Sequence, residues 1–258
     1  MKVATWNVNS LRVRLPHLLE WLVANVPDVM CLQETKCEDT TFPADELAAA
    51  GYRSAHNGQR TYNGVAILSR EEGAEVCRGI PRFADDQSRV IAADFGGVRI
   101  VSVYVPNGQS VGSEKYAYKL RWFEAFVAWL EAELAAYPRL AVLGDFNVAP
   151  EERDVHDPAA WEGSVLVSLP ERAALARLTG VGFVDGFRLF EQPEKSFTWW
   201  DYRMGAFRRN MGLRIDHAFL SAPLARACTS CTIDVAPRRL ERPSDHAPLV
   251  CELDLAAA

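Results

Sequence analysis

The feature that most constrains the fold is a pair of short apolar runs separated by only two glycines. Residues 89–95 and 98–105 are rich in β-branched and other apolar residues, and Gly96 and Gly97 lie between them. Paired glycines are typical of a tight hairpin, because glycine readily adopts the positive φ angles that such turns require. The two runs are therefore predicted to be antiparallel strands, which excludes a purely parallel, doubly wound sheet.

The spacing of apolar residues predicts further strands and three helices along the chain. Strands are predicted at residues 2–6, 28–32, 64–69, 140–143, 197–200, 214–220, 229–235 and 248–253. Helices are predicted at residues 11–26, 113–137 and 170–178. The shared apolar face of the middle helix is Tyr116, Leu120, Phe123, Val127, Leu130 and Leu134. This pattern predicts an α/β (α+β) fold, a four-layer αββα sandwich of two packed mixed β-sheets with helices outside.

Composition bounds the class of protein. The chain has 258 residues, of which 49% are hydrophobic, and no linker-like stretch divides it, so we expect one domain over residues 1–258. The net charge of −6 disfavours a nucleic-acid partner, although DNA binding needs only a local positive surface. No signal peptide and no membrane span are recognisable, so we expect a cytoplasmic protein without a membrane partner, and a monomer.

The six cysteines do not form a pattern typical of a disulfide scaffold. Cys228 and Cys231 form a C-x-x-C pair, which could be half of a zinc site or a redox pair. There is no second pair and no nearby histidine to complete four ligands, so buried thiols in a strand are the favoured interpretation.

Polar side chains stand at the ends of six predicted strands. They are Asn7, Glu34, Tyr104, Asp145 with Asn147, Asp216, and Asp245 with His246. Each residue alone could equally cap a turn, but together they favour a site at a shared rim. Alternation places Asp145 and Asn147 on one face if the strand continues through both, and Gly144 permits a close backbone approach.

The residue types indicate a hard divalent cation, because carboxylate and amide oxygens are the preferred ligands of Mg²⁺ and Mn²⁺. Glu34 is the first candidate ligand, since an unpaired carboxylate at the end of an apolar strand would be costly.

The chain resembles the exodeoxyribonuclease III family of abasic-site endonucleases, within the endonuclease/exonuclease/phosphatase superfamily. The matching segments are TWNVNSLR (5–12), PDVMCLQETK (27–36), YNGVAILSR (62–70), SRVIAADF (88–95), YVPNG (104–108), KYAYKLRW (115–122), LGDFNVAP (143–150), FTWWDYR (197–203), GLRIDHAFLS (212–221) and ERPSDHAPLV (241–250). They run in family order over nearly the whole chain, and LQET, GDFN and SDHAP together are highly specific. The family's fold is the same four-layer sandwich.

The resemblance implies a role for each residue of the rim. Glu34 would bind the metal with Asn7 beside it, and Asp245 would be a ligand at a second or shifted metal position. Asp145 would orient or deprotonate the attacking water, and Asn147 would hydrogen-bond a non-bridging phosphate oxygen.

Three further residues complete the implied catalytic set. His246, polarised by Asp216, would contact the phosphate, and Tyr104 would donate to the phosphate or assist the leaving group. The Asp216 carboxylate would raise the pKa of the His246 imidazole and favour a cationic phosphate clamp.

A small apolar pocket and several cations are expected to hold DNA. By resemblance, Trp199, Leu213 and Ile215 would wall a pocket for an extrahelical, baseless sugar, whereas Trp200 is better explained as core. The cations that could grip phosphates are Lys115, Lys119, Arg121, Arg203, Arg208, Arg209 and Arg214. For each of them alone, a solvated surface position is nearly as good an explanation.

The function that these residues favour is a Mg²⁺-dependent DNA repair nuclease, with Mn²⁺ as a possible substitute. Its expected partner is double-stranded DNA with abasic sites or blocked 3′ ends. The alternatives are a phosphatase of the same superfamily acting on a small molecule, and a catalytically silent nucleic-acid-binding module.

His156 lies in a loop that varies among family members. A surface position is the simpler interpretation, and the sharper hypothesis is that the imidazole intrudes near the sugar pocket and favours trimming of 3′ ends.

Overall fold

The computed structural model describes residues 1–257 and contains two mixed six-stranded sheets packed face to face. The strands of the first sheet, in spatial order, are β11 (Cys228–Ile233), β12 (Leu249–Leu253), β1 (Lys2–Asn7), β2 (Val29–Gln33), β4 (Val65–Ser69) and β3 (Arg53–Asn57). Those of the second are β5 (Ala74–Arg78), β6 (Val90–Phe95), β7 (Val98–Tyr104), β8 (Leu140–Asp145), β10 (Asp216–Leu220) and β9 (Val184–Asp185). The pairs β1–β2 and β7–β8 are parallel, and the other ladders are antiparallel.

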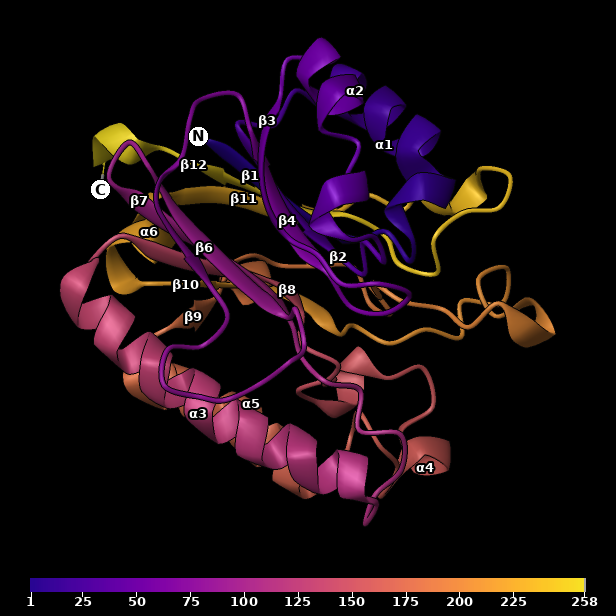
Figure 1. The fold of residues 1–258 in the computed structure, drawn as a ribbon. Coiled ribbons are helices and arrows are strands. Elements are labelled where there is room, and N and C mark those ends of the chain that lie inside the picture. Colours follow the sequence, from indigo (N-terminus) through magenta and orange to yellow (C-terminus); the bar gives the residue numbers. More distant parts are fainter. Residues whose placement is uncertain (258) are drawn as a thin grey trace.

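Helices cover the outer face of each sheet, so the predicted αββα sandwich is confirmed (Figure 1). Helices α1 (Leu11–Asn25) and α2 (Ala44–Ala49) lie on the first sheet, and α3 (Glu114–Ala136) and α5 (Leu169–Val181) lie on the second. The short helices are α4 (Pro158–Trp161) and α6 (Ala222–Ala227). Within residues 1–257, none of the helices combines the length and apolar character needed to cross a bilayer.

Three layers of apolar side chains hold these elements together. The layer between the sheets joins residues of both, such as Val29 and Ile67 with Ile100 and Leu143. Separate clusters fill the interface of the first sheet with its helices and that of the second sheet with α3 and α5. Because strands such as β4 are buried on both faces, they are apolar at successive positions rather than alternately.

One polar ladder crosses the inner layer directly behind the rim. The Thr5 hydroxyl donates to Gln33 over 3.1 Å, and the Gln33 amide donates to the Ser102 hydroxyl over 3.1 Å. All three side chains are buried, and such groups require partners because an unpaired buried amide costs about 1–3 kcal/mol. The ladder therefore fixes the position of β2 on β7 immediately before Glu34.

Most predicted elements are confirmed, whereas the short elements β9, α2, α4 and α6 and two edge strands were not predicted. The hairpin of β6 and β7 pairs Phe95 with Val98 across the two glycines. The strands β3 and β5 were not predicted, because both are edge strands with half-buried or exposed residues and lack a continuous apolar run. Residues 197–200 were wrongly predicted as a strand, since Trp199 makes only isolated bridges to Leu213 and His246.

Among the described residues, the cysteines do not belong to a group that could hold a zinc ion. Cys231 is buried and lies opposite Cys251 on β12, and Cys228 is half-buried. In residues 1–257, the one group of His, Cys, Asp and Glu side chains close enough to share a metal ion is Glu34, Asp145 and His246.

Candidate active site

The functional side chains meet at one rim because four strands deliver them from the same direction. The parallel pair β1 and β2 ends at Asn7 and immediately before Glu34, and the parallel pair β7 and β8 ends at Tyr104 and Asp145. Strand β10 runs antiparallel to β8 and begins at Asp216, directly opposite Asp145. The loop before β12 adds His246, so the strand ends singled out in the sequence form one site.

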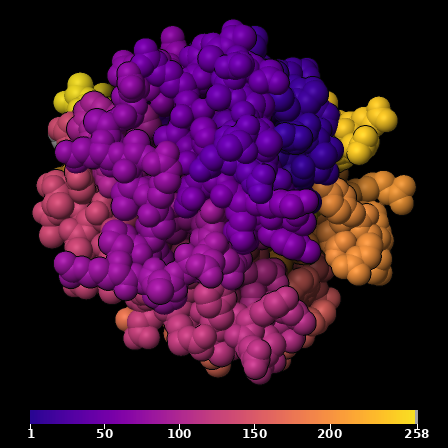
Figure 2. Space-filling model, viewed as in Figure 1, coloured from indigo at the N-terminus to yellow at the C-terminus, as the bar shows by residue number. Residues whose placement is uncertain are grey.

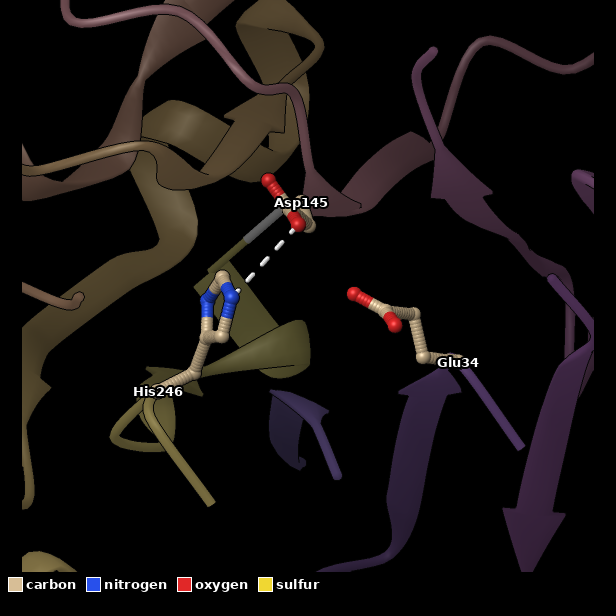
Figure 3. Close-up of side chains that lie close together, drawn as sticks. All are labelled: Glu34, Asp145 and His246. Carbon is tan, nitrogen blue, oxygen red and sulfur yellow. Dashed lines mark ion pairs between the residues drawn. The ribbon is translucent and has the colours of Figure 1, made fainter. Parts of the chain in front are cut away.

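A chain of ion pairs runs through the centre of this site. His246 Nδ1 lies 2.8 Å from Asp216 Oδ2, and His246 Nε2 lies 3.7 Å from Asp145 Oδ2. Figure 3 shows Glu34 extending toward this pair from the end of β2, and the dashed line marks the contact of His246 with Asp145. One ligand atom from each of Glu34, Asp145 and His246 lies within 4.8 Å of the other two.

Burial and neighbouring charges set the protonation states of His246 and Asp145. Burial acts to lower the pKa of His246, but the Asp216 and Asp145 carboxylates outweigh it and raise this pKa to about 10. Burial raises the pKa of Asp145 to about 7, with His246 opposing the shift and Asp216 adding to it. His246 is therefore a cation at neutral pH, and Asp145 can accept a proton there.

Tyr104 closes the rim on the side of the second sheet. Burial and the nearby Glu34 and Asp145 carboxylates raise the pKa of its phenol well above the usual value. The Arg89 guanidinium lies 4.8 Å from the centroid of the ring. The phenol therefore keeps its proton at physiological pH and is available as a hydrogen-bond donor.

The donor set fits a hard cation held by carboxylates. The Asn7 amide donates to Glu34 Oε1 over 2.8 Å and to Asp145 Oδ2 over 2.9 Å, which holds the two carboxylates toward each other. Such crowding of negative charge is favourable when a divalent cation is bound between the groups. His246 is geometrically close, but a protonated imidazole bonded to Asp216 has no free lone pair for a metal.

Two residues of the site were missed by the sequence reasoning. The Lys36 ammonium lies 2.8 Å from Glu34 Oε2 and donates to Asn9 Oδ1 over 2.6 Å. The signal was present, because Lys36 follows Glu34 by two residues in LQETK and Asn9 follows Asn7 by two in TWNVNS.

The backbone around the site contains strained conformations. Glu34 and Asn147 both have φ of 51°, a left-handed conformation that costs an ordinary residue about 1–2 kcal/mol. Strand β8 ends at Asp145, so the strand does not continue through Asn147. The two side chains nevertheless meet, with Asn147 Nδ2 3.4 Å from Asp145 Oδ2. Gly144 makes the predicted close approach, since a Cβ there would lie 1.9 Å from the Val103 carbonyl oxygen.

Asp245 lies beside the central cluster rather than within it. Its Oδ1 accepts from the Asn9 amide over 2.9 Å, and its Oδ2 accepts from the Trp199 indole over 2.9 Å. Trp199 in turn packs against the cluster that contains the buried Leu213 and Ile215. The three residues expected to wall a sugar pocket therefore lie together, next to the loop that presents His246. Trp200 is 2% exposed and belongs to the core, as expected.

Arg214 is a correction. It was expected to contact DNA phosphates, but its side chain is 1% exposed. The guanidinium forms ion pairs with Asp154 and Asp185, each with an N–O distance of 2.7 Å. Its guanidinium also lies 3.0 Å from His217 Nδ1, and His217 Nε2 lies 2.9 Å from the Val148 carbonyl oxygen. Arg214 therefore holds the loop after β8 to the beginning of β10 and is not a surface cation.

Lys119 is a second correction, because it was grouped with the surface cations and is fully buried against Glu171. The remaining expected cations are exposed: Lys115, Arg121, Arg203, Arg208 and Arg209. Three of them lie on the segment around residue 205, which projects from the body beside the segment around residue 240 (Figure 2). The Tyr202 hydroxyl joins the two segments by donating to the Pro243 carbonyl over 2.9 Å.

His156 lies at the edge of the apolar cluster. Its Nδ1 is 3.3 Å from the Gly212 carbonyl oxygen, and its ring makes an edge contact with Trp161 at 6.3 Å between centroids. The imidazole is therefore partly buried, not a free surface side chain.

A four-layer α/β sandwich with carboxylates, an imidazolium and amides at one rim defines a class of hydrolytic nucleases and phosphatases. The chain belongs to the Endonuclease/Exonuclease/phosphatase family, whose model matches residues 4–246. It is 36% identical over 266 aligned residues to exodeoxyribonuclease III of Haemophilus influenzae, with 98% of this chain and 99% of that protein covered. The resemblance seen in the sequence is confirmed.

Two solved structures are similar over almost the whole chain. The 3′ phosphatase NExo from Neisseria, solved with a product DNA hairpin, is 43% identical with a TM-score of 0.97, covering 98% of this chain and 99% of that one. An AP endonuclease from Archaeoglobus fulgidus is 40% identical with a TM-score of 0.95, over 98% of this chain and 99% of that one.

The buried His217 should make the folded protein less stable in acid. Burial and the adjacent Arg214 guanidinium lower the pKa of His217 to about 4. An unfolded histidine binds its proton near pH 6.5, so this group destabilises the fold as pH falls from 6.5 toward 4, by about 3 kcal/mol in total. In His217→Gln, which keeps a donor for Val148 and an acceptor for Arg214, the free energy of unfolding should fall less between pH 7 and pH 4.5. Urea titrations at both pH values measure this, and an equal fall in both proteins would contradict the assignment of a neutral imidazole.

Proposed function

We propose that this protein is a divalent-cation-dependent DNA repair nuclease that hydrolyses phosphodiester bonds in double-stranded DNA. Its proposed substrates are duplexes with abasic sites or blocked 3′ ends, which it would incise, trim at the 3′ end and digest in the 3′→5′ direction. The observation that carries the proposal is the ion-paired chain of Asp216, His246 and Asp145 facing Glu34 at one rim. The similarity to the Haemophilus exodeoxyribonuclease III, the Neisseria 3′ phosphatase and the Archaeoglobus AP endonuclease supports the same assignment.

Glu34 would hold the cation, proposed to be Mg²⁺ or alternatively Mn²⁺, with Asn7 and Asp145 beside it. When bound, the cation would neutralise charge on the scissile phosphate. Asp245 would be a ligand at a second or shifted metal position, because each of its oxygens keeps a lone pair while it accepts from Asn9 or Trp199. Through the bond to Trp199 it would also position the wall of the sugar pocket.

The protein groups divide the remaining chemistry. Asp145, whose pKa is raised to about 7 by burial, would take a proton from the attacking water near neutral pH. The His246 cation would bind a non-bridging phosphate oxygen, and the Asn147 amide, one of whose N–H groups donates to the Val105 carbonyl, would use its other N–H for the same group. Tyr104 keeps its proton, so its single O–H would donate either to the phosphate or to the departing 3′ oxygen.

The DNA would be held by the exposed cations and the apolar cluster. Lys115 and the arginines around residue 205 would bind backbone phosphates without reading sequence. Trp199, Leu213 and Ile215 would receive a sugar that carries no base, since extrusion is cheapest where nothing stacks. His156, at the edge of this cluster, would narrow the pocket and favour 3′-end trimming over internal incision.

A labelled duplex with one central abasic site tests the proposal. With Mg²⁺ the protein should cut on the 5′ side of the abasic site, and a nicked duplex with a 3′ phosphate should lose that group. Excess chelator should reduce both rates by at least about 100-fold, and added Mg²⁺ should restore them. Sized products on a denaturing gel give the readout, with an undamaged blunt duplex as the control. Intact DNA under all conditions, with hydrolysis of a small phosphate ester instead, would contradict the proposal.

Replacing Asp216 with Asn tests the role of the histidine cation. Without the Asp216 carboxylate, the pKa of His246 should fall toward 6.5, so the cation is lost as pH rises through neutrality. Turnover at pH 8 should fall by about 100-fold, whereas the dissociation constant for DNA should change by less than about threefold. The ratio of variant to wild-type turnover should rise as pH falls from 8 to 6, because both proteins keep the Asp145 base and only the variant regains a histidine cation. Rates and fluorescence anisotropy measure these effects, and unchanged turnover at pH 8 would refute the role.

A further inference from the structure

A buried lysine binds the backbone of Asn107 and of Asn147, whose side-chain amide is proposed to contact the phosphate. Lys119 is on α3, its side chain is fully buried, and its ammonium has three hydrogen-bond acceptors within reach. These are Asn147 O at 2.7 Å, Asn107 O at 3.1 Å and Glu171 Oε1 at 2.5 Å. An ammonium has three N–H donors, so the group is fully used by these contacts.

The two carbonyls that Lys119 binds belong to residues whose side chains pair with each other. Asn107 Nδ2 donates to Asn147 Oδ1 over 3.1 Å. Asn107 follows β7 and Asn147 follows β8, so one ammonium fixes the turns that leave two neighbouring strands. The Lys119 ammonium thus anchors the Asn107–Asn147 pair of amides by binding both backbone carbonyls.

The backbone of Asn147 depends on this anchor. Its N–H donates to Asp145 Oδ1 over 2.9 Å and its C=O accepts from Lys119, so the left-handed conformation is held at both ends. Without the ammonium, the Asn147 carbonyl would be buried without its donor, a cost of about 1–3 kcal/mol that a rotated peptide would relieve. Rotation of that peptide would move the Asn147 side chain.

Two neighbouring residues, Glu171 and Gly108, fix the position of the Lys119 side chain. Glu171 on α5 accepts from the Leu166 and Ser168 backbone N–H groups in addition to Lys119, so its carboxylate cannot turn away. Gly108 leaves room for the lysine stem, because a Cβ there would lie 3.1 Å from Lys119 Cδ.

We infer that Lys119 is a positioning residue for the nuclease reaction, acting by fixing the Asn107–Asn147 amide pair against the scissile phosphate. The inference rests on the proposed function, because it assigns Asn147 to the phosphate. Lys119 does not touch DNA and supplies no binding energy to it. Its contribution is geometric, and a displacement of about 1 Å at such a group can lower turnover by about 100-fold.

The test is a double-mutant cycle between Lys119→Met and Asn147→Ala on the abasic duplex. In the wild-type background, Lys119→Met should lower kcat by about 30-fold or more and change KM by less than about threefold. In the Asn147→Ala background, the same change should lower kcat by less than about threefold, since the phosphate-contacting member of the pair is gone and Asn107 has lost the amide oxygen that it binds. A residue that only stabilises the helices would show no such dependence on Asn147.

Two variants separate positioning from stability. Arg99→Met removes a different buried ion pair, which joins Arg99 on β7 to Glu133 near the C-terminal end of α3. This variant should have a lower melting temperature and an unchanged kcat. Lys119→Met with Glu171→Gln removes both buried charges and keeps an oxygen for the Ser168 N–H, so it should fold more stably than Lys119→Met alone while kcat stays low.

The outcomes are distinct. Cleavage by the wild type with unchanged kcat in Lys119→Met, or equal losses in both backgrounds, overturns the inference and leaves the proposed function standing. Recovery of kcat together with stability in the double variant also overturns it. Absence of DNA cleavage by the wild type overturns the proposed function, and the inference falls with it.

Discussion

The structure depends on a concentration of negative charge at the edge where the two sheets meet. Glu34 comes from the first sheet, Asp145 and Asp216 come from the second, and the buried His246 cation lies between the last two. Buried carboxylates are tolerated only when they are paired or hydrogen-bonded, and here the pairing partners come from distant parts of the chain. The sandwich therefore has to be complete before the site exists.

The surrounding structure restrains these groups instead of adding further chemistry. The Thr5–Gln33–Ser102 ladder locks the strand before Glu34 onto the opposite sheet. Arg214 ties the loop after β8 to β10 through Asp154 and Asp185. A site held by rigid strands and buried ion pairs can keep donors aimed at a phosphate without reorganisation, which is the condition for electrostatic stabilisation of a transition state.

The sequence predicted the sandwich and the meeting of polar strand ends at one rim, because apolar periodicity and polar residues at strand ends are local signals. Family motifs then supplied roles for residues such as Glu34 and His246. Burial of charge was not predictable, since Lys119 and Arg214 look like ordinary surface cations until their partners Glu171 and Asp154 are brought beside them by the fold. The edge strands β3 and β5 were missed for the opposite reason, because half-exposed strands carry too little apolar pattern.

The proposed seating of a divalent cation by Glu34 and its neighbours can be tested by direct cation binding, without any turnover. Mn²⁺ titrations followed by electron paramagnetic resonance should show binding to the wild-type protein. The affinity should be at least about tenfold lower in Glu34→Gln and unchanged in Glu38→Gln, which alters an exposed carboxylate near the same loop. Equal affinity in the wild type and Glu34→Gln would contradict the account.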